Sequence, residues 1–557
     1  MTATVAPGFR THEVFNQAPP RTGVNEYTSN IPLAEGVARY DAGWAAGSLT
    51  DVGDLVGTES FQHDAELANT VPPVFHSHDR YGNRIDEVEF HPAYHRIIGA
   101  AVAHGAHTSA WADPRPGANV ARAATFMLFA QVEAGHACPI SMTHSVVPAL
   151  EFSPEIAHLW LPRLYSRGYD GRLRAPGDKP GVLFGMAITE KQGGSDVRAN
   201  TTRAVPNGNG SWSLTGHKWF CSAPMSDGFL ILAQAQDAHL ADSAALSCFL
   251  VPRVLEDGTR NVFRIQRLKD KLGNKSNASS EIELDGTLGF LVGEPGRGVR
   301  TIIEMVSRTR LDCVYGSAAG MRQSVAEALW HVRHRAAFGA TLIDQPAMTA
   351  VAADLALESE AATVTALRLA RAHDADAGDT EQAFRRLATA VAKYWICKRG
   401  PHHAYEALEC LGGNGYTEAF PLARRYREQP VMAVWEGSGN VIALDVLRAM
   451  TREPESVDAF DAELATARGA SALFDSHHDR LRAALAELSS LPAEQAQLRA
   501  RGVASAMALG LQASLLLRHS PAPVAEAFLA ARLGADRDFQ YGSLPAGTDF
   551  ATILDRH

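Results

Sequence analysis

The chain changes its sequence pattern twice, and these changes restrict its fold more than any other feature. Residues 25–181 are rich in alanine and carry apolar side chains at helical spacing, as at Val120, Ala124 and Leu128. From about Val182, short β-type segments separated by Asn, Gly and Asp turns replace that pattern. Helical spacing returns after Gly298. The order helical, β, helical predicts an α+β fold that is mainly α.

The chain length predicts several packed domains, because 557 residues are too many for one hydrophobic core. We predict an N-terminal helical domain over residues 1–181, a central β domain over 182–297 and a second helical domain over 298–450. Residues 451–557 contain helix-like stretches interrupted by prolines, which predict an appended helical unit.

The composition restricts the functional classes. A hydrophobic fraction of 46%, a charged fraction of 20% and a net charge of −10 are typical of a soluble, mildly acidic globular protein and require no nucleic acid. The six cysteines stand singly without a C-x-x-C pair, so we expect reduced thiols. The first residues lack a signal-peptide pattern, and the apolar stretch 502–517 is shorter than a membrane span. We therefore expect a cytoplasmic protein without a membrane segment.

Several common catalytic motifs are missing. The sequence contains no G-x-G-x-x-G fingerprint, Walker A loop, H-E-x-x-H or G-x-S-x-G elbow, so a bound flavin must be held in another way. The pairs His402-His403 and His477-His478 are adjacent and cannot face one metal from one side of a helix. We expect them at the surface or at helix ends, and we predict no metal site.

The first chemical signal is an apolar strand followed by two glycines at residues 186–197. Backbone amides freed by that turn, with the hydroxyls of Thr189 and Ser195, can donate to a polar cofactor edge or a phosphate. A strand followed by an ordinary polar loop explains the stretch equally well.

Two further signals are weak alone. Aromatic side chains beside a small hydroxyl at residues 216–222 can form a wall for a flat ring system, although core strands often contain aromatics. Arg335, in the stretch 335–339, can hold a pyrophosphate, and Gln345 follows ten residues later. A surface ion pair is the simpler explanation of Arg335.

The fourth signal combines two glycine-rich stretches at residues 412–416 and 435–440. Glu436 lies beside Trp435 and before a glycine-rich turn, where a desolvated carboxylate can act as a base. Taken alone, the segment fits a solvated loop carboxylate better.

Together these stretches resemble the acyl-CoA dehydrogenase superfamily. The shared patterns are T-E-x-x-x-G-S-D at 189–196, G-x-K-x-aromatic-x-S/T at 216–222, R-x-x-F-G at 335–339, G-G-N-G-Y/F at 412–416 and Y/W-E-G-S/T at 435–438. The resemblance covers residues 119–448, and stretches 186–203 and 267–280 are most similar to the AidB-like flavoproteins linked to the adaptive response to alkylation. It implies a helical domain, a β-barrel domain and a four-helix bundle with FAD between barrel and bundle, plus the appended C-terminal helical domain.

The resemblance also assigns residues. Thr189 is expected at the flavin ring edge, and Ser195 at the cofactor or the substrate. Arg310, in the segment 307–310, is expected at the substrate, although a helix-surface ion pair explains Arg310 equally well. The implied cofactor residues are Met186, Ala187, Ile188, Thr189, Glu190, Lys191, Gln192, Gly193, Gly194, Ser195, Phe220, Cys221, Ser222, Arg335, Gln345, Gly412, Gly413, Val434, Trp435, Gly437, Ser438, Gly439, Asn440, Val441, Ile442, Ala443 and Leu444. Phe220, Cys221 and Ser222 would form the flavin wall. Arg335, Gln345, Gly412 and Gly413 would reach the FAD of a neighbouring subunit, which implies a homotetramer.

By the same resemblance, Glu436 is the base that removes the α-proton of an acyl-CoA while the β-hydride leaves to flavin N5, giving a 2,3-enoyl-CoA. Lys191, Phe220 and Trp435 stand where dehydrogenases usually carry proline, tryptophan and tyrosine, so the chain-length preference is open. The implied partners are acyl-CoA, an electron acceptor such as electron-transfer flavoprotein, and further copies of the chain.

A second function belongs to another class, a double-stranded DNA-binding flavoprotein that protects against alkylation. It would need a basic surface on the tail. Residues 451–557 instead hold 10 Arg and no Lys against 14 Asp and Glu, a net charge of −4, so we rank DNA binding second.

Overall fold

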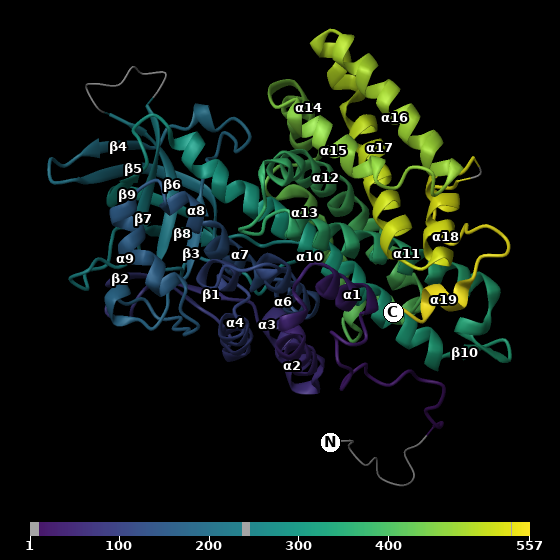
Figure 1. The fold of residues 1–557 in the computed structure, drawn as a ribbon. Coiled ribbons are helices and arrows are strands. Elements are labelled where there is room, and N and C mark those ends of the chain that lie inside the picture. Colours follow the sequence, from purple (N-terminus) through teal and green to yellow (C-terminus); the bar gives the residue numbers. More distant parts are fainter. Residues whose placement is uncertain (1–10, 237–244, 536) are drawn as a thin grey trace.

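The computed structural model describes residues 11–236, 245–535 and 537–557. The strands β1 to β9 lie on one side of the molecule and the C-terminal helices on the other, with long helices between them (Figure 1). An α+β fold that is mainly helical is thereby confirmed.

The N-terminal part is helical except for one hairpin. Its helices are α1 (Ile31–Arg39), α2 (Ala46–Gly57), α3 (Glu59–Thr70), α4 (Pro92–Ala103), α5 (Ser109–Ala112), α6 (Ala118–Val132), α7 (Ala137–Ser145), α8 (Val147–Leu150) and α9 (Pro154–Leu164). The hairpin pairs β1 (Val74–His78) with β2 (Arg84–Glu89) in antiparallel register. It is absent from the predicted helical domain, because two short strands leave little periodic signal between long helices.

The central strands form a closed barrel. They are β3 (Phe184–Ala187), β4 (Arg203–Pro206), β5 (Ser211–Ser222), β6 (Gly228–Ala235), β7 (Leu246–Pro252), β8 (Arg264–Leu268) and β9 (Ser279–Val292). β6 pairs with β7, β7 with β9, β9 with β5, β5 with β4, and β4 again with β6, so the ring closes. Closure leaves β3 and β8 as side strands on β6 and β9.

Long helices follow the barrel. They are α10 (Gly298–His334), α11 (Pro346–Arg371), α12 (Asp379–Glu409), α13 (Pro421–Val434) and α14 (Gly439–Arg452), with a small hairpin of β10 (Ala336–Ala337) and β11 (Ala340–Thr341) after α10. The Arg122 guanidinium on α6 forms a buried bidentate pair with the Asp312 carboxylate on α10. This pair fixes the N-terminal helices against α10.

The chain ends with α15 (Glu455–Ala465), α16 (Ala472–Ser490), α17 (Ala493–His519), α18 (Ala522–Leu533) and α19 (Phe550–Leu554). α17 is long and apolar enough to cross a membrane, yet 67% of its most apolar window is buried within the protein. It packs on α11, α12, α14, α16 and α18, so the buried helix expected for residues 502–517 is confirmed.

The histidine pairs differ from their predicted surface placement. His403, His477 and His478 are all buried, and His478 Nε2 lies 2.7 Å from Asp461 Oδ1. His477 Nε2 bonds the Ala506 carbonyl oxygen at 2.9 Å. Tertiary packing of apolar helix faces, which sequence adjacency does not reveal, carries these rings inside.

Candidate active site

Glu436 lies in the tight connection between α13 and α14. It has a left-handed backbone with φ of +58°, and Gly437 follows with φ of +114°. A non-glycine residue with this φ is uncommon and persists where its surroundings fix it. The turn therefore needs contacts from outside α13 and α14.

Arg310 on α10 supplies one such contact. Its Nε donates to the Glu436 carbonyl oxygen at 2.9 Å, and its Nη1 donates to Asp445 Oδ2 at 2.9 Å. Asp445, on α14, also lies 3.2 Å from Arg448 and 3.5 Å from Arg386. Arg310, predicted at the substrate, thus holds the turn that carries Glu436.

The Glu436 carboxyl is adapted to accept a proton. Burial raises its pKa above the ordinary 4.5, and the charges of Arg310 and Lys393 and a hydrogen bond from Thr309 only partly offset that rise. Beside it, Trp435 packs against the buried cluster of Cys313, Cys397 and Met432. A desolvated carboxylate is a stronger base than a solvated one.

The predicted first cofactor segment begins on β3 and turns at the glycines. Glu190 and Gly193 exchange backbone hydrogen bonds of 3.2 and 3.1 Å, which close the turn. A Cβ on Gly194 would lie 2.4 Å from Thr189 Oγ1, so only glycine fits there. Ser195 and Asp196 lie exposed beyond the turn, where they can meet a ligand.

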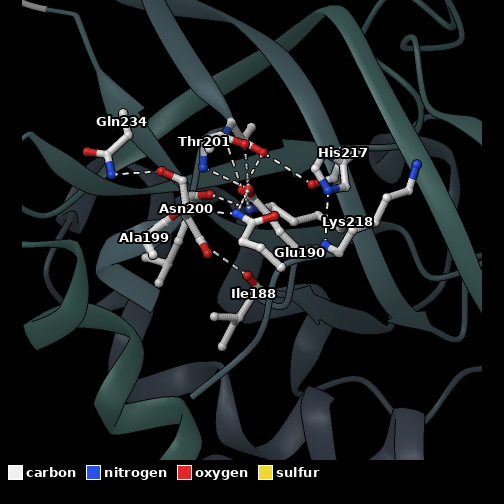
Figure 2. Close-up of polar contacts among 12 residues, drawn as sticks. Ile188, Glu190, Ala199, Asn200, Thr201, His217, Lys218 and Gln234 are labelled. Carbon is white, nitrogen blue, oxygen red and sulfur yellow. Dashed lines mark hydrogen bonds and ion pairs between the residues drawn. The ribbon is translucent and has the colours of Figure 1, made fainter. Parts of the chain in front are cut away.

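The Glu190 side chain, by contrast, is used by the protein itself. Its carboxylate receives Lys218 Nζ at 2.8 Å and the hydroxyls of Thr202 and Thr201 at 2.6 and 2.9 Å (Figure 2). Both backbone amides of these threonines also donate to it. Burial alone would raise its pKa, but the Lys218 charge and these hydrogen bonds lower the pKa strongly. Glu190 anchors the loop and leaves only its backbone for a cofactor.

The predicted flavin wall on β5 is divided by strand geometry. Trp219 N donates to Thr189 O at 2.8 Å, which sets β5 beside the first cofactor segment. Phe220 is 50% exposed and Ser222 is partly exposed, whereas Cys221 is fully buried in the core. Successive strand residues point to opposite faces, so the Cys221 side chain turns away from the face that carries Phe220 and Ser222.

Cys138 lies beside this wall, and the sequence pattern did not single it out. Its thiol, on α7, is within hydrogen-bond reach of Ser222 and Asn277 and feels the charges of Glu436 and Lys271. Burial is the main effect that raises its pKa to about 12, so the thiol stays neutral. A single cysteine beside Pro139 carries no signal for this position, because the contacts come from distant parts of the chain.

The second cofactor segment lies at the start of α14. Ser438 occupies the N-cap position without a side-chain cap bond, and the side-chain Oδ1 of Asn440 accepts a hydrogen bond of 2.8 Å from Arg501 Nε of α17. Val434 and Leu444 are exposed, whereas Ile442 and Ala443 are buried and offer only backbone. Free hydroxyl and amide groups at a helix N-terminus suit a phosphate-bearing cofactor such as FAD.

Arg335 and Gln345, two of the residues predicted to serve a neighbouring subunit, lie far from Glu436. Arg335, at the end of α10, is separated from Arg310 by about 37 Å of helix, at 1.5 Å per residue. Arg335 donates to the Asn16 carbonyl oxygen, and Gln345 Nε2 donates to Ala337 O at 2.9 Å. Added Cβ atoms on Gly412 and Gly413 would meet nothing within 4 Å. The chain does not bring Arg335 and Gln345 to its own Glu436, and it leaves the surface at Gly412 and Gly413 open.

Three family models match the chain over most of its length. They are the adaptive response protein AidB N-terminal domain at residues 16–171, the acyl-CoA dehydrogenase middle domain at 185–287 and the acyl-CoA dehydrogenase C-terminal domain at 296–451. AidB from Escherichia coli (strain K12) is 44% identical over 522 residues, covering 93% of this chain and 94% of AidB. The chain belongs to the acyl-CoA dehydrogenase family. Its N-terminal match and its identity to AidB place it in the AidB-like branch of that family.

A second relative and two solved structures are also similar to this chain. Acyl-CoA dehydrogenase family member 11 of Caenorhabditis elegans is 30% identical over 74% of this chain and 68% of that protein. The solved structure of ACDH-11 in complex with C11-CoA superposes with a TM-score of 0.84 at 26% identity, covering 100% of this chain and 95% of that chain. The Bd2924 apo-form superposes with a TM-score of 0.81 at 28% identity, covering 91% of this chain and 100% of that chain.

Proposed function

We propose that the protein is an FAD-dependent acyl-CoA dehydrogenase in which Glu436 removes the α-proton of the substrate, giving a 2,3-enoyl-CoA. The observation that carries the proposal is the desolvated Glu436 carboxyl on a left-handed turn that Arg310 of α10 holds through the Glu436 carbonyl oxygen. Family membership and the acyl-CoA named with the ACDH-11 structure support it.

The free groups of the site fit FAD. The exposed Ser195 loop, the face of Phe220 and Ser222, and the uncapped N-terminus of α14 at Ser438 would hold it. Bound FAD supplies the acceptor for the hydride that leaves the β-carbon. An acceptor such as electron-transfer flavoprotein would then take up the electrons.

The protein groups prepare the proton transfer. Arg310 and the turn fix the carboxylate, and burial beside Trp435 limits water, so the ionised base is poorly solvated and reactive. The amide of Glu436 lies beyond the last helical bond of α13, made by Trp435 N, and would donate to the thioester oxygen as charge develops there.

A homotetramer completes the proposal. Phe338 and Tyr416, beside the residues predicted to serve a neighbour, are 101% and 86% exposed. Such aromatic side chains are typical of covered interfaces. Sedimentation of the holoprotein tests the tetramer, and a monomer with full activity would contradict this arrangement.

The test is anaerobic mixing of the holoprotein with a panel of acyl-CoA thioesters while flavin bleaching is followed. Glu436→Gln should slow reduction by roughly two to four orders of magnitude, because it removes the base. Glu418→Gln, which alters an exposed glutamate paired with Arg427, should leave the rate unchanged. Equal rates in wild type and Glu436→Gln would reject the assignment.

DNA binding has no comparable support in the tail. Of its 10 arginines, six form ion pairs within the described residues: Arg468, Arg482, Arg499, Arg518, Arg532 and Arg556. The alternative stays a prediction, and the salt dependence of retention on duplex DNA measures how many phosphates the surface contacts.

A further inference from the structure

Lys393 on α12 differs from the other buried lysines. Lys179 Nζ lies 2.5 Å from Asp227, and Lys218 Nζ lies 2.8 Å from Glu190. Lys393 is only 1% exposed, yet no ion pair joins it to a carboxylate of the described residues. A buried ammonium without a countercharge is unfavourable unless other groups compensate it.

The compensating groups flank the predicted base. Lys393 Nζ donates to the carbonyl oxygen of Gly437 and, at 3.3 Å, to that of Ala433. Ala433 belongs to the last turn of α13, and Gly437 follows Glu436 directly. One ammonium thus bridges the helix end and the left-handed turn across Glu436.

The charges around Glu436 are unequal on its two sides. Arg310, from α10, is paired with Asp445, an acid that it shares with Arg386 and Arg448. Lys393, from α12, acts on Glu436 without such an acid. The other groups facing the carboxyl are the Thr309 hydroxyl and the Cys138 and Cys313 thiols, which are neutral. Of the two cations that act on Glu436, Lys393 is thus the one without an acid partner among the described residues.

We propose that Lys393 is a positioning residue for Glu436: its ammonium ties the carbonyls on either side of the turn and supplies the positive charge that keeps the carboxylate ionised when substrate excludes water. The proposal rests on the function proposed above. Lys393 does not touch the substrate in this account; it acts through the turn and through its field.

The test compares Lys393→Met, Lys393→Arg and wild type as holoproteins. For Lys393→Met, the pH midpoint of flavin reduction should rise by about one unit or more, because an opposite charge near the carboxyl is lost. Lys393→Arg should restore the wild-type midpoint, even if its rate is lower. In the Glu436→Gln background, Lys393→Met should shift no midpoint.

Lys179→Met is the matched control, since it removes a buried lysine that faces Asp227 instead. It should lower stability and leave the midpoint of flavin reduction in place. Coincident pH profiles for wild type and Lys393→Met would overturn the proposal and leave Lys393 a structural residue.

A second readout needs no turnover. The unfolding free energy of wild type minus that of Lys393→Met should grow as pH rises through the pKa of folded Glu436, which lies above the ordinary 4.5, because the ionised Glu436 of the variant lacks its cation. Glu436→Gln should abolish this growth. If no acyl-CoA reduces the wild-type flavin, the proposed function fails, while this unfolding experiment still decides the role of Lys393. A difference in unfolding free energy that is independent of pH would overturn the role proposed for Lys393.

Discussion

Two glutamates in the predicted motifs take opposite roles because their surroundings differ. Glu190 accepts hydrogen bonds from Lys218 and from two threonines, so its charge is fully compensated and its pKa is lowered. Glu436 is desolvated with only partial compensation, so its pKa is raised. The first is an anchor for the cofactor loop and the second is available to exchange a proton.

Glu190→Gln should lower the unfolding free energy by about 3–5 kcal/mol, because it leaves the Lys218 ammonium buried without a countercharge. The contribution of Glu190 is present above its unfolded pKa and is lost as pH falls through the lowered folded value, so the difference should shrink in acid. Chemical denaturation at several pH values measures this difference in unfolding free energy. Glu283→Gln, at an exposed position of β9, is the control, and an equal loss there would contradict the anchor role.

At the scale of elements, the connection between α13 and α14 depends on α10 and α12. Arg310 and Lys393 hold the carbonyls of Glu436, Gly437 and Ala433 from these two helices. Because the turn is left-handed at Glu436, loss of a tie allows the carboxyl to move. Placement of the base is therefore a property of four helices together.

Arg310→Met should slow flavin reduction by about 100-fold, since a small displacement of a catalytic group has costs of that order. Arg448→Met is the matched control, because Arg448 shares the Asp445 contact but is 57% exposed. Stopped-flow reduction compares the two. A similar effect of both variants would show that only the charge of Asp445 matters.

The order of the helical and β segments could be predicted from the sequence. Helical spacing and β alternation are local, so the change from helices to strands near Val182 and the return near Gly298 were visible. Strand alternation could also have separated Cys221 from Phe220 and Ser222. The roles of Glu190, Cys138 and Lys393 could not be predicted, because each depends on contacts with segments distant in the chain.

In the whole molecule, the C-terminal helices pack against the helical bundle. α17 packs on α11, α12 and α14, and Arg501 of α17 contacts Asn440 at the start of α14. The appended unit therefore supports the same helix that carries the second cofactor segment. We expect the tail and the helical bundle to unfold together.

Leu515→Ala should lower the unfolding free energy by about 2–5 kcal/mol, because Leu515 is 0% exposed and its loss leaves a cavity. Leu498→Ala in the same helix should change it by less than about 0.5 kcal/mol, since Leu498 is 86% exposed. Thermal unfolding followed by circular dichroism tests both. Two separate unfolding transitions, with only one affected by Leu515→Ala, would contradict the expectation that the tail and the helical bundle unfold together.

If Glu436 removes the α-proton, isotopic substitution at the α-carbon should slow reduction of the flavin. The measurement is stopped-flow reduction of the wild-type flavin by an acyl-CoA that bleaches it, compared with the same thioester deuterated at C2. We predict clearly slower reduction of the wild-type flavin by the deuterated substrate and, in Glu436→Gln, loss of α-hydrogen exchange with solvent. Equal reduction rates for the two substrates together with undiminished exchange in Glu436→Gln would contradict the account.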